Sequence, residues 1–188
     1  MGAEIEGEDT ATLVINGVSE LAASHYSVMP DRIEAGTFLV AAAVTRGSIT
    51  VENAYAEHLG IVLEKLRDAG VDVTIEGNTI TADMTKGQLT SVDLITAPYP
   101  GFPTDMQAQF TALNVVAEGV GRITETIFEN RLMQAHEMSR MGADITVDGH
   151  SVIIRGKSSI DGAPVMASDL RASASLVIAG LAAKGETH

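Results

Sequence analysis

Two stretches of the chain, LRDAGVDVTIEGNTI at residues 66–80 and MSRMGADITVDGHSVI at residues 138–153, follow one plan. Each ends a helix-like run at a glycine, Gly70 or Gly142, the residue type that commonly follows the C-terminus of a helix. Each then alternates apolar and polar residues on both sides of a two-residue turn that contains glycine, which is typical of a β-hairpin. The sequence therefore predicts a helix followed by a hairpin at both places.

The N-terminal stretch MGAEIEGEDTATLVING, residues 1–17, reads as a third copy of this hairpin, with Gly2 in the place of Gly70 and Gly142. The three glycines recur at a spacing of about 70 residues, and a fixed period indicates an architecture built from similar units. The repeat therefore predicts the fold more strongly than any single helix or strand.

A second pattern repeats between the hairpins. A helix of small and apolar residues ends in a corner with glycine and a charged residue, then runs into a β-rich segment, at residues 35–54, 105–128 and 169–188. In the first of these helices, residues 38–44 leave no polar face, so we expect it to be buried on all sides.

The helices that precede the two hairpins, at residues 57–70 and 130–142, carry apolar residues on one stripe and charges opposite, as amphipathic helices do. Each unit therefore reads as buried helix, strand, amphipathic helix and hairpin. This order predicts an α/β fold turned inside out, with buried helices inside, sheets outside and the third unit incomplete. Because the sequence opens on a hairpin and stops after a first helix, we expect it to be part of a longer chain.

The composition excludes several classes of protein. Lys and Arg total 12 against 25 Asp and Glu, for a formal net charge of −13, which argues against a nucleic-acid partner because phosphate backbones need a basic face. The chain has no cysteine, so it holds no disulfide, thiolate metal site or cysteine nucleophile. Its five histidines form no metal-binding pattern. We expect neither metal nor cofactor.

The N-terminus is acidic and lacks the apolar core of a signal peptide. No apolar run approaches the roughly 18 residues of a membrane span. We expect a cytoplasmic protein without a membrane partner.

The stretch APYPGFPTDMQAQFTALN, residues 97–114, places three prolines ahead of Asp105, at the mouth of a predicted helix. Proline restricts the backbone, so the position of this carboxylate is preset, as a general base requires. The pattern by itself favours a cap of the helix, since both Thr104 and Asp105 are good N-cap types.

Several motifs together resemble one family, the UDP-N-acetylglucosamine enolpyruvyl transferases, which are 1-carboxyvinyltransferases. The motifs cover nearly the whole chain: PDRIEAGTFLVAAA (30–43), APYPGFPTDMQAQF (97–110), FENRLM (128–133), SRMGADI (139–145) and SDLRASASLVIAGL (168–181). The resemblance implies transfer of an enolpyruvyl group from phosphoenolpyruvate to the 3′-hydroxyl of UDP-N-acetylglucosamine, with release of phosphate, through a tetrahedral intermediate. This reaction begins peptidoglycan synthesis, on which the cell wall, cell shape and cell division depend.

The resemblance implies two inside-out α/β prism domains of three units each. Residues 1–29 resemble the last hairpin of the catalytic-loop domain. Residues 30–188 resemble most of the other domain, with units at about 30–96 and 97–165 and a partial unit at 166–188.

In this comparison the chain looks like the second half of such an enzyme. Three family features are missing: an N-terminal Lys-Asn pair, a flexible loop with a reactive Cys or Asp, and a C-terminal Arg-Gly-Tyr segment. We therefore expect that the chain alone does not turn over and that the catalytic-loop domain is its natural partner.

The family match assigns roles to five residues. Asp105 corresponds to the carboxylate that contacts the sugar 3′-hydroxyl and is proposed to take its proton, which reverses the preference for a cap. Ile127 corresponds to a position that contacts the nucleotide sugar, although an Ile in a β-rich run is otherwise core. Arg131 and Arg171 correspond to arginines of the phosphoenolpyruvate region, where a guanidinium suits carboxylate or phosphate. Asp169 either caps its helix or supports the site.

Two alternatives to these roles stay open. Arg131 could be a solvated charge at a helix start, paired with Glu129. The whole chain could be a folded scaffold without useful ligand affinity, one that associates with itself through unpaired strand edges. A related enzyme, the shikimate-pathway enolpyruvyl transferase, shares the fold, but the motif PGFPTDMQAQF at residues 100–110 favours the amino-sugar enzyme.

Overall fold

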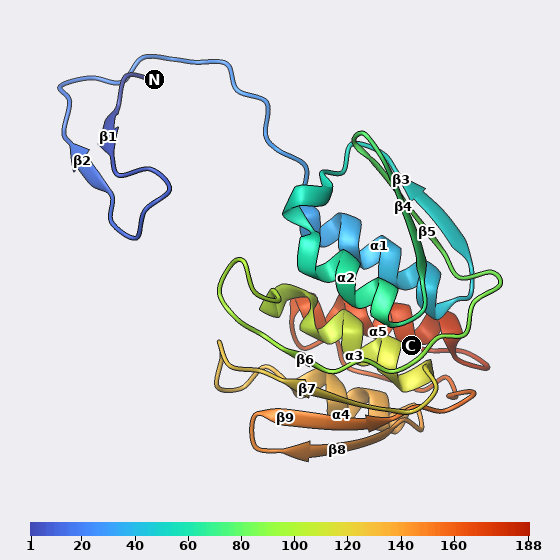
Figure 1. The fold of residues 1–188 in the computed structure, drawn as a ribbon. Coiled ribbons are helices and arrows are strands. Elements are labelled where there is room, and N and C mark those ends of the chain that lie inside the picture. Colours follow the sequence, from blue (N-terminus) through green and yellow to red (C-terminus); the bar gives the residue numbers. More distant parts are fainter.

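The computed structural model describes residues 1–188 as two similar units that follow an N-terminal hairpin (Figure 1). The hairpin and the first unit contain β1 (Glu4–Glu6), β2 (Val14–Asn16), α1 (Arg32–Val44), β3 (Ser48–Val51), the 3-10 helix η1 (Ala56–His58), α2 (Gly60–Asp68), β4 (Asp72–Glu76) and β5 (Thr79–Asp83). The second unit contains β6 (Leu94–Ile95), the 3-10 helix η2 (Thr104–Met106), α3 (Gln107–Val116), β7 (Val120–Thr124), α4 (Met133–Arg140), β8 (Asp144–Asp148) and β9 (Ser151–Arg155), and α5 (Leu170–Ala182) follows it.

Each unit builds one sheet around its hairpin. The first sheet has the order β3-β5-β4 and is antiparallel, and the second has the order β6-β7-β9-β8, in which the short β6 runs parallel to β7. Both predicted two-residue turns are confirmed, because Glu76 pairs with Thr79 and Asp148 pairs with Ser151.

The glycines that mark the repeat share one backbone conformation. Gly2, Gly70 and Gly142 have φ angles of +87°, +90° and +88°, a region that residues with a side chain rarely adopt. At Gly70 and Gly142 the positive φ directly follows the last turn of α2 and of α4. The predicted helix ends are therefore confirmed, and the repeat is visible in the backbone itself.

Helices α1, α3 and α5 pack against one another in the interior, and the two sheets lie outside them (Figure 1). The amphipathic helices α2 and α4 lie against α1 and α5 respectively, and each also contacts the edge strand of its sheet, β4 or β8. Buried apolar residues from both units form one core. The predicted inside-out α/β arrangement is thus confirmed.

The prediction that the first helix is buried on all sides is wrong in one respect. The Phe38 side chain of α1 is 49% exposed, and on α5 Val177 and Leu181 are 65% and 61% exposed. Helix α3 packs against both α1 and α5 and is buried at every residue from Gln107 to Val115.

The N-terminal hairpin stands apart from the two units (Figure 1). Strands β1 and β2 pair only with each other, and every residue from 1 to 28 is exposed. The two strands occur where the repeat predicts them, but residues 7–13 join them in place of a two-residue turn. The third copy therefore matches the other two in its strands and in Gly2, and differs in its loop.

Helix α3, buried from Gln107 to Val115, carries four polar side chains, and three of them bond to other segments. Asn114 accepts a hydrogen bond from the Val92 amide at 3.0 Å and donates one to the Val92 carbonyl at 2.9 Å. Nε2 of Gln109 donates to Thr37 on α1 at 3.1 Å. The remaining bonds join Gln134 of α4 to Gln107 and Thr111 to Gln107. Because buried polar groups are costly when unpaired, these bonds fix the orientation of α3 relative to its neighbours.

The Asn114→Ala variant tests this constraint. The substitution leaves both the N–H and the C=O of Val92 buried without a partner, and we expect the free energy of unfolding to fall by about 2 to 4 kcal/mol. Urea unfolding measures the loss. Asn130→Ala removes the same side chain from an exposed position without a hydrogen bond and should change stability by less than about 0.5 kcal/mol. An equal effect of the two substitutions would contradict the account.

Candidate functional site

The loop that carries Asp105 is anchored on both sides. Thr96 forms an isolated β-bridge with Phe102, and the buried Phe102 ring meets Phe110 of α3 edge to face, with the ring centroids 5.1 Å apart. Pro103 then leads into η2, which continues directly as α3. Because α3 is buried throughout, the position of Asp105 at its mouth is determined by the core.

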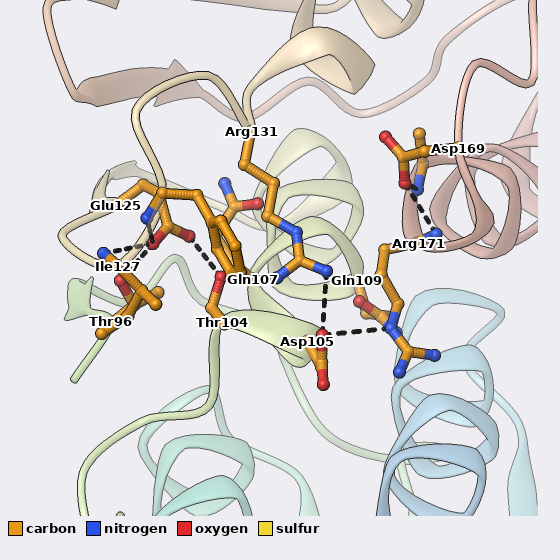
Figure 2. Close-up of polar contacts among 12 residues, drawn as sticks. Thr96, Thr104, Asp105, Gln107, Gln109, Glu125, Ile127, Arg131, Asp169 and Arg171 are labelled. Carbon is orange, nitrogen blue, oxygen red and sulfur yellow. Dashed lines mark hydrogen bonds and ion pairs between the residues drawn. The ribbon is translucent and has the colours of Figure 1, made fainter. Parts of the chain in front are cut away.

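Asp105 pairs with arginines from two other elements (Figure 2). Its Oδ1 atom lies 2.9 Å from an Nη of Arg131, which precedes α4, and 3.2 Å from Nε of Arg171, in the first turn of α5. The Asp105 side chain accepts no backbone N–H, so it is not the cap of its helix. Three segments far apart in the sequence therefore meet at one carboxylate oxygen.

The two arginines determine the charge state of Asp105. Partial burial raises the pKa of the Asp105 carboxyl, but the hydrogen bond and charge of Arg171, followed by those of Arg131, outweigh burial and hold the pKa below its ordinary value of 3.8. The side chain remains 34% exposed, and Oδ2 has no protein partner. Asp105 is thus an ionised group with one oxygen free to meet a ligand.

Arg131 is held from three sides. Besides Asp105, its guanidinium donates to Thr104 Oγ1 at 3.0 Å and lies over the Phe128 ring, 4.6 Å from the centroid. It makes no ion pair with Glu129, so the alternative of a solvated charge paired with that residue is wrong.

Asp169 caps α5. Its carboxylate accepts the backbone N–H groups of Arg171 at 2.8 Å and Ala172 at 2.9 Å. The cap interpretation of Asp169 is therefore confirmed. The same bond fixes the backbone of Arg171, so Asp169 also orients the residue that pairs with Asp105.

Two cavities meet at Asp105. One of about 400 Å³ lies between the proline-rich loop and the start of α2, and Asp105, Ile127 and Tyr99 are among its lining residues. The other, of about 420 Å³, is lined by Asp105, Arg131 and Arg171 together with Asp169. The first therefore offers a mostly uncharged wall, and the second presents two guanidinium groups beside two carboxylates, with Asp105 common to both.

Glu125, which lies beside Ile127 (Figure 2), was not among the predicted site residues. Its side chain is 1% exposed and accepts four hydrogen bonds, from Thr96 Oγ1, Thr104 Oγ1 and the amides of Ile127 and Phe128. A single glutamate in a β-rich run gives no sign of burial, so nothing in the sequence pattern could have indicated it.

No group of three or more His, Cys, Asp or Glu side chains is placed to hold a metal ion. No helix is long and apolar enough to cross a membrane.

A family model described as EPSP synthase (3-phosphoshikimate 1-carboxyvinyltransferase) matches residues 1–188. The chain belongs to this family. Among curated proteins, UDP-N-acetylglucosamine 1-carboxyvinyltransferases from strains of Coxiella burnetii are 58% identical over 187 residues, which is 100% of this chain and 43% of theirs. The chain thus spans less than half the length of these relatives of the EPSP synthase family.

Two solved structures of the family are similar in fold. The enolpyruvyl transferase NikO from Streptomyces tendae aligns with a TM-score of 0.82 and 28% identity, over 99% of this chain and 45% of its own. An EPSP synthase from Acinetobacter baumannii aligns with a TM-score of 0.64 over 86% of this chain and 39% of its own, and at 18% identity it shows the fold alone. The predicted resemblance to enolpyruvyl transferases is confirmed.

The pH dependence of stability tests the ion pairs of Asp105. Because the pKa of Asp105 is lowered by folding, its ionised form stabilises the folded chain above its ordinary pKa, and this contribution disappears as the pH falls through the folded value. Asp105→Asn should therefore be less stable than the parent chain at about pH 7, and the difference should shrink as the pH falls below about 4. Urea unfolding across this range measures it.

Asp148→Asn serves as the control, since Asp148 is exposed and makes no ion pair. Its effect on stability should be less than about 0.5 kcal/mol. A gap between parent and Asp105→Asn that stays constant down to about pH 3 would show that the arginines do not stabilise the Asp105 charge.

Proposed function

We propose that this chain forms part of a UDP-N-acetylglucosamine 1-carboxyvinyltransferase. The observation that carries the proposal is the placement of one ionised carboxylate, Asp105, between a mostly uncharged cavity and a cavity lined by two arginines. Curated enzymes that are 58% identical to the chain carry that name. The reaction joins an uncharged sugar hydroxyl to a strongly anionic small molecule, and the two cavities offer matching surroundings.

The sugar nucleotide would lie on the side of Asp105 and Ile127. Ile127 is 39% exposed and lines the same cavity as Asp105. The Ile127 amide is already used by Glu125, so its carbonyl and side chain are the groups that can face a sugar. Asp105 Oδ2, which has no protein partner, is the acceptor for the 3′-hydroxyl proton.

Phosphoenolpyruvate would lie on the side of Arg131 and Arg171. Guanidinium groups bind carboxylate and phosphate through paired hydrogen bonds. Each arginine uses a single N–H toward Asp105, so further donors of both remain for a ligand. In a chain of net charge −13, this local pair of cations gives an anion a favourable place to bind.

In the proposed reaction, Asp105 takes a proton from the 3′-hydroxyl of the sugar. The sugar oxygen adds to C2 of phosphoenolpyruvate, and C3 gains a proton. The tetrahedral intermediate then loses phosphate from C2 and a proton from C3, which restores the double bond and completes the transfer. With its pKa lowered by two arginines, Asp105 is a weak base in the free chain. An anionic ligand that draws Arg131 and Arg171 to itself would raise this pKa, so one substrate would prepare the base for the other.

The chain would supply half of this site, and a catalytic-loop domain would supply the rest. We infer that the isolated chain binds without turnover, and that the enzyme acts in the cytoplasm, where its phosphorylated substrates are made. Nothing observed in the site favours the shikimate-pathway reaction, since the EPSP synthase structure shares only the fold at 18% identity.

An amide NMR titration with UDP-N-acetylglucosamine tests the sugar side. We expect saturable shifts for Asp105, Ile127 and their neighbours, and loss of these shifts in Asp105→Ala, because the acceptor for the 3′-hydroxyl is gone. Asp148→Ala, an exposed site far from Asp105 in the sequence, should bind like the parent. Dispersed spectra without any ligand shift would count against the proposal and leave a scaffold as the function of the isolated chain.

A carboxyl NMR titration with phosphoenolpyruvate tests the cationic side. We expect the pKa of the Asp105 carboxyl to rise when the ligand is present, because the ligand competes for Arg131 and Arg171 and adds negative charge nearby. The Asp148 carboxyl gives an internal control that should not move. A pKa of Asp105 that is unchanged at saturating ligand would refute binding at the two arginines.

A further inference from the structure

Glu125 is the most deeply buried carboxylate beside the site, and it has no cationic partner. Its 1% exposed side chain forms no ion pair, and all of its partners are neutral donors. A buried carboxylate is costly unless hydrogen bonds compensate it. Four hydrogen bonds compensate the buried charge of Glu125. They connect the four donor groups through this one carboxylate.

Three of the four bonds meet at one oxygen. Oε1 accepts Thr96 Oγ1 at 2.8 Å, the Ile127 amide at 2.8 Å and the Phe128 amide at 3.2 Å. These bonds set the turn that presents Ile127 to the cavity. They also join this turn to the strand end that precedes the proline-rich loop, because Thr96 follows β6 directly.

The fourth bond reaches the charged part of the site. Oε2 accepts Thr104 Oγ1 at 2.7 Å, and the same Thr104 oxygen accepts an N–H of Arg131 at 3.0 Å. Because the Thr104 hydroxyl donates its only proton to Glu125, its lone pairs face Arg131. A second N–H of Arg131 then reaches Asp105 at 2.9 Å. A continuous chain of hydrogen bonds thus runs from Glu125 through Thr104 and Arg131 to Asp105.

We propose that Glu125 is a positioning residue of the proposed transferase site, which holds the Ile127 turn through Oε1 and aims Arg131 at Asp105 through Oε2 and Thr104. This inference deepens the proposed function and rests on it for the identity of the ligands. Glu125 itself touches neither cavity that Asp105 lines, so it acts only through the groups it holds.

Glu125→Gln tests the polarity of this chain of bonds. The amide retains an oxygen for the three donors at Oε1 but replaces Oε2 with an N–H group, which competes with Arg131 for the Thr104 oxygen. The charged groups that face Asp105 are Arg131 and Arg171. With Arg131 released, the pKa of the Asp105 carboxyl should rise, and carboxyl NMR of the 188-residue chain without ligand measures it.

Glu129→Gln is the matched control, because Glu129 is exposed, lies four residues away and makes no hydrogen bond with Arg131. Both substitutions remove one negative charge near the site, and loss of a like charge lowers or leaves the pKa of Asp105. Glu129→Gln should therefore lower the pKa of Asp105 or leave it unchanged, whereas Glu125→Gln should raise it. A pKa of Asp105 in Glu125→Gln at or below that of the parent would overturn the proposal.

If Glu125→Gln does not fold, two substitutions of Thr104 test the same proposal. Thr104→Val removes the hydroxyl that links Glu125 to Arg131 and should raise the pKa of Asp105, whereas Thr104→Ser keeps the hydroxyl and should match the parent. Equal values in the valine and serine variants would overturn the proposal.

The proposed function and this inference fail in different ways. If the parent chain shows no shift with UDP-N-acetylglucosamine, the assigned ligand fails, while the comparison of Asp105 pKa values still decides the role of Glu125. If the parent binds, Glu125→Ala, which also removes the Oε1 acceptor that holds the Ile127 turn, should weaken the affinity by about tenfold, as expected for one displaced hydrogen-bonded group, and Glu129→Ala should leave it within about twofold. Unchanged affinity in a folded Glu125→Ala variant would contradict a role in holding Ile127.

Discussion

The complete burial of α3 is the constraint on which the rest of this structure depends. A helix enclosed by α1, α5 and the second sheet cannot leave its polar side chains in water, and three of them, Gln107, Gln109 and Asn114, bond to three different neighbours. Asn114 binds both backbone groups of Val92, and Gln109 reaches Thr37 on α1. Apolar contact alone would tolerate small rotations of α3, whereas these directional bonds select one orientation.

The orientation of α3 also determines the position of Asp105. Helix α3 continues without a break from η2, so any rotation of α3 would carry Asp105 with it. The partners of Asp105 come from elements that are themselves tied down: Arg171 by the cap from Asp169, and Arg131 by Thr104 and Phe128. A site assembled from three segments thus keeps its geometry because the core and the local caps each remove a different freedom.

The repeat and the features that obey local rules could be predicted from the sequence. Hairpin turns, the glycines after α2 and α4 and the inside-out order all derive from patterns within a few residues. The exposed Phe38 was not predictable, because the pattern shows that a helix lacks a polar face but not which neighbours cover it. Asp105, Arg131 and Arg171 could be matched to a family. The meeting of both arginines at one oxygen of Asp105 could not be predicted, because it depends on how α4 and α5 approach Asp105. Glu125 gave no signal because two of the four neutral donors that compensate its burial, Thr96 and Thr104, come from distant positions in the sequence.

The charges of the site are balanced within the free chain, and that balance has a consequence for binding. Asp105 pairs with both arginines through a single oxygen, so it is their counter-ion in the free chain. A ligand that is itself an anion can replace this partner at little electrostatic cost, because the arginines exchange one negative group for another. The carboxylate that is displaced then has a raised proton affinity and one more free oxygen. In the proposed transferase, binding on one side of Asp105 would thereby be coupled to proton transfer on the other through an exchange of ion-pair partners, without any movement of α3.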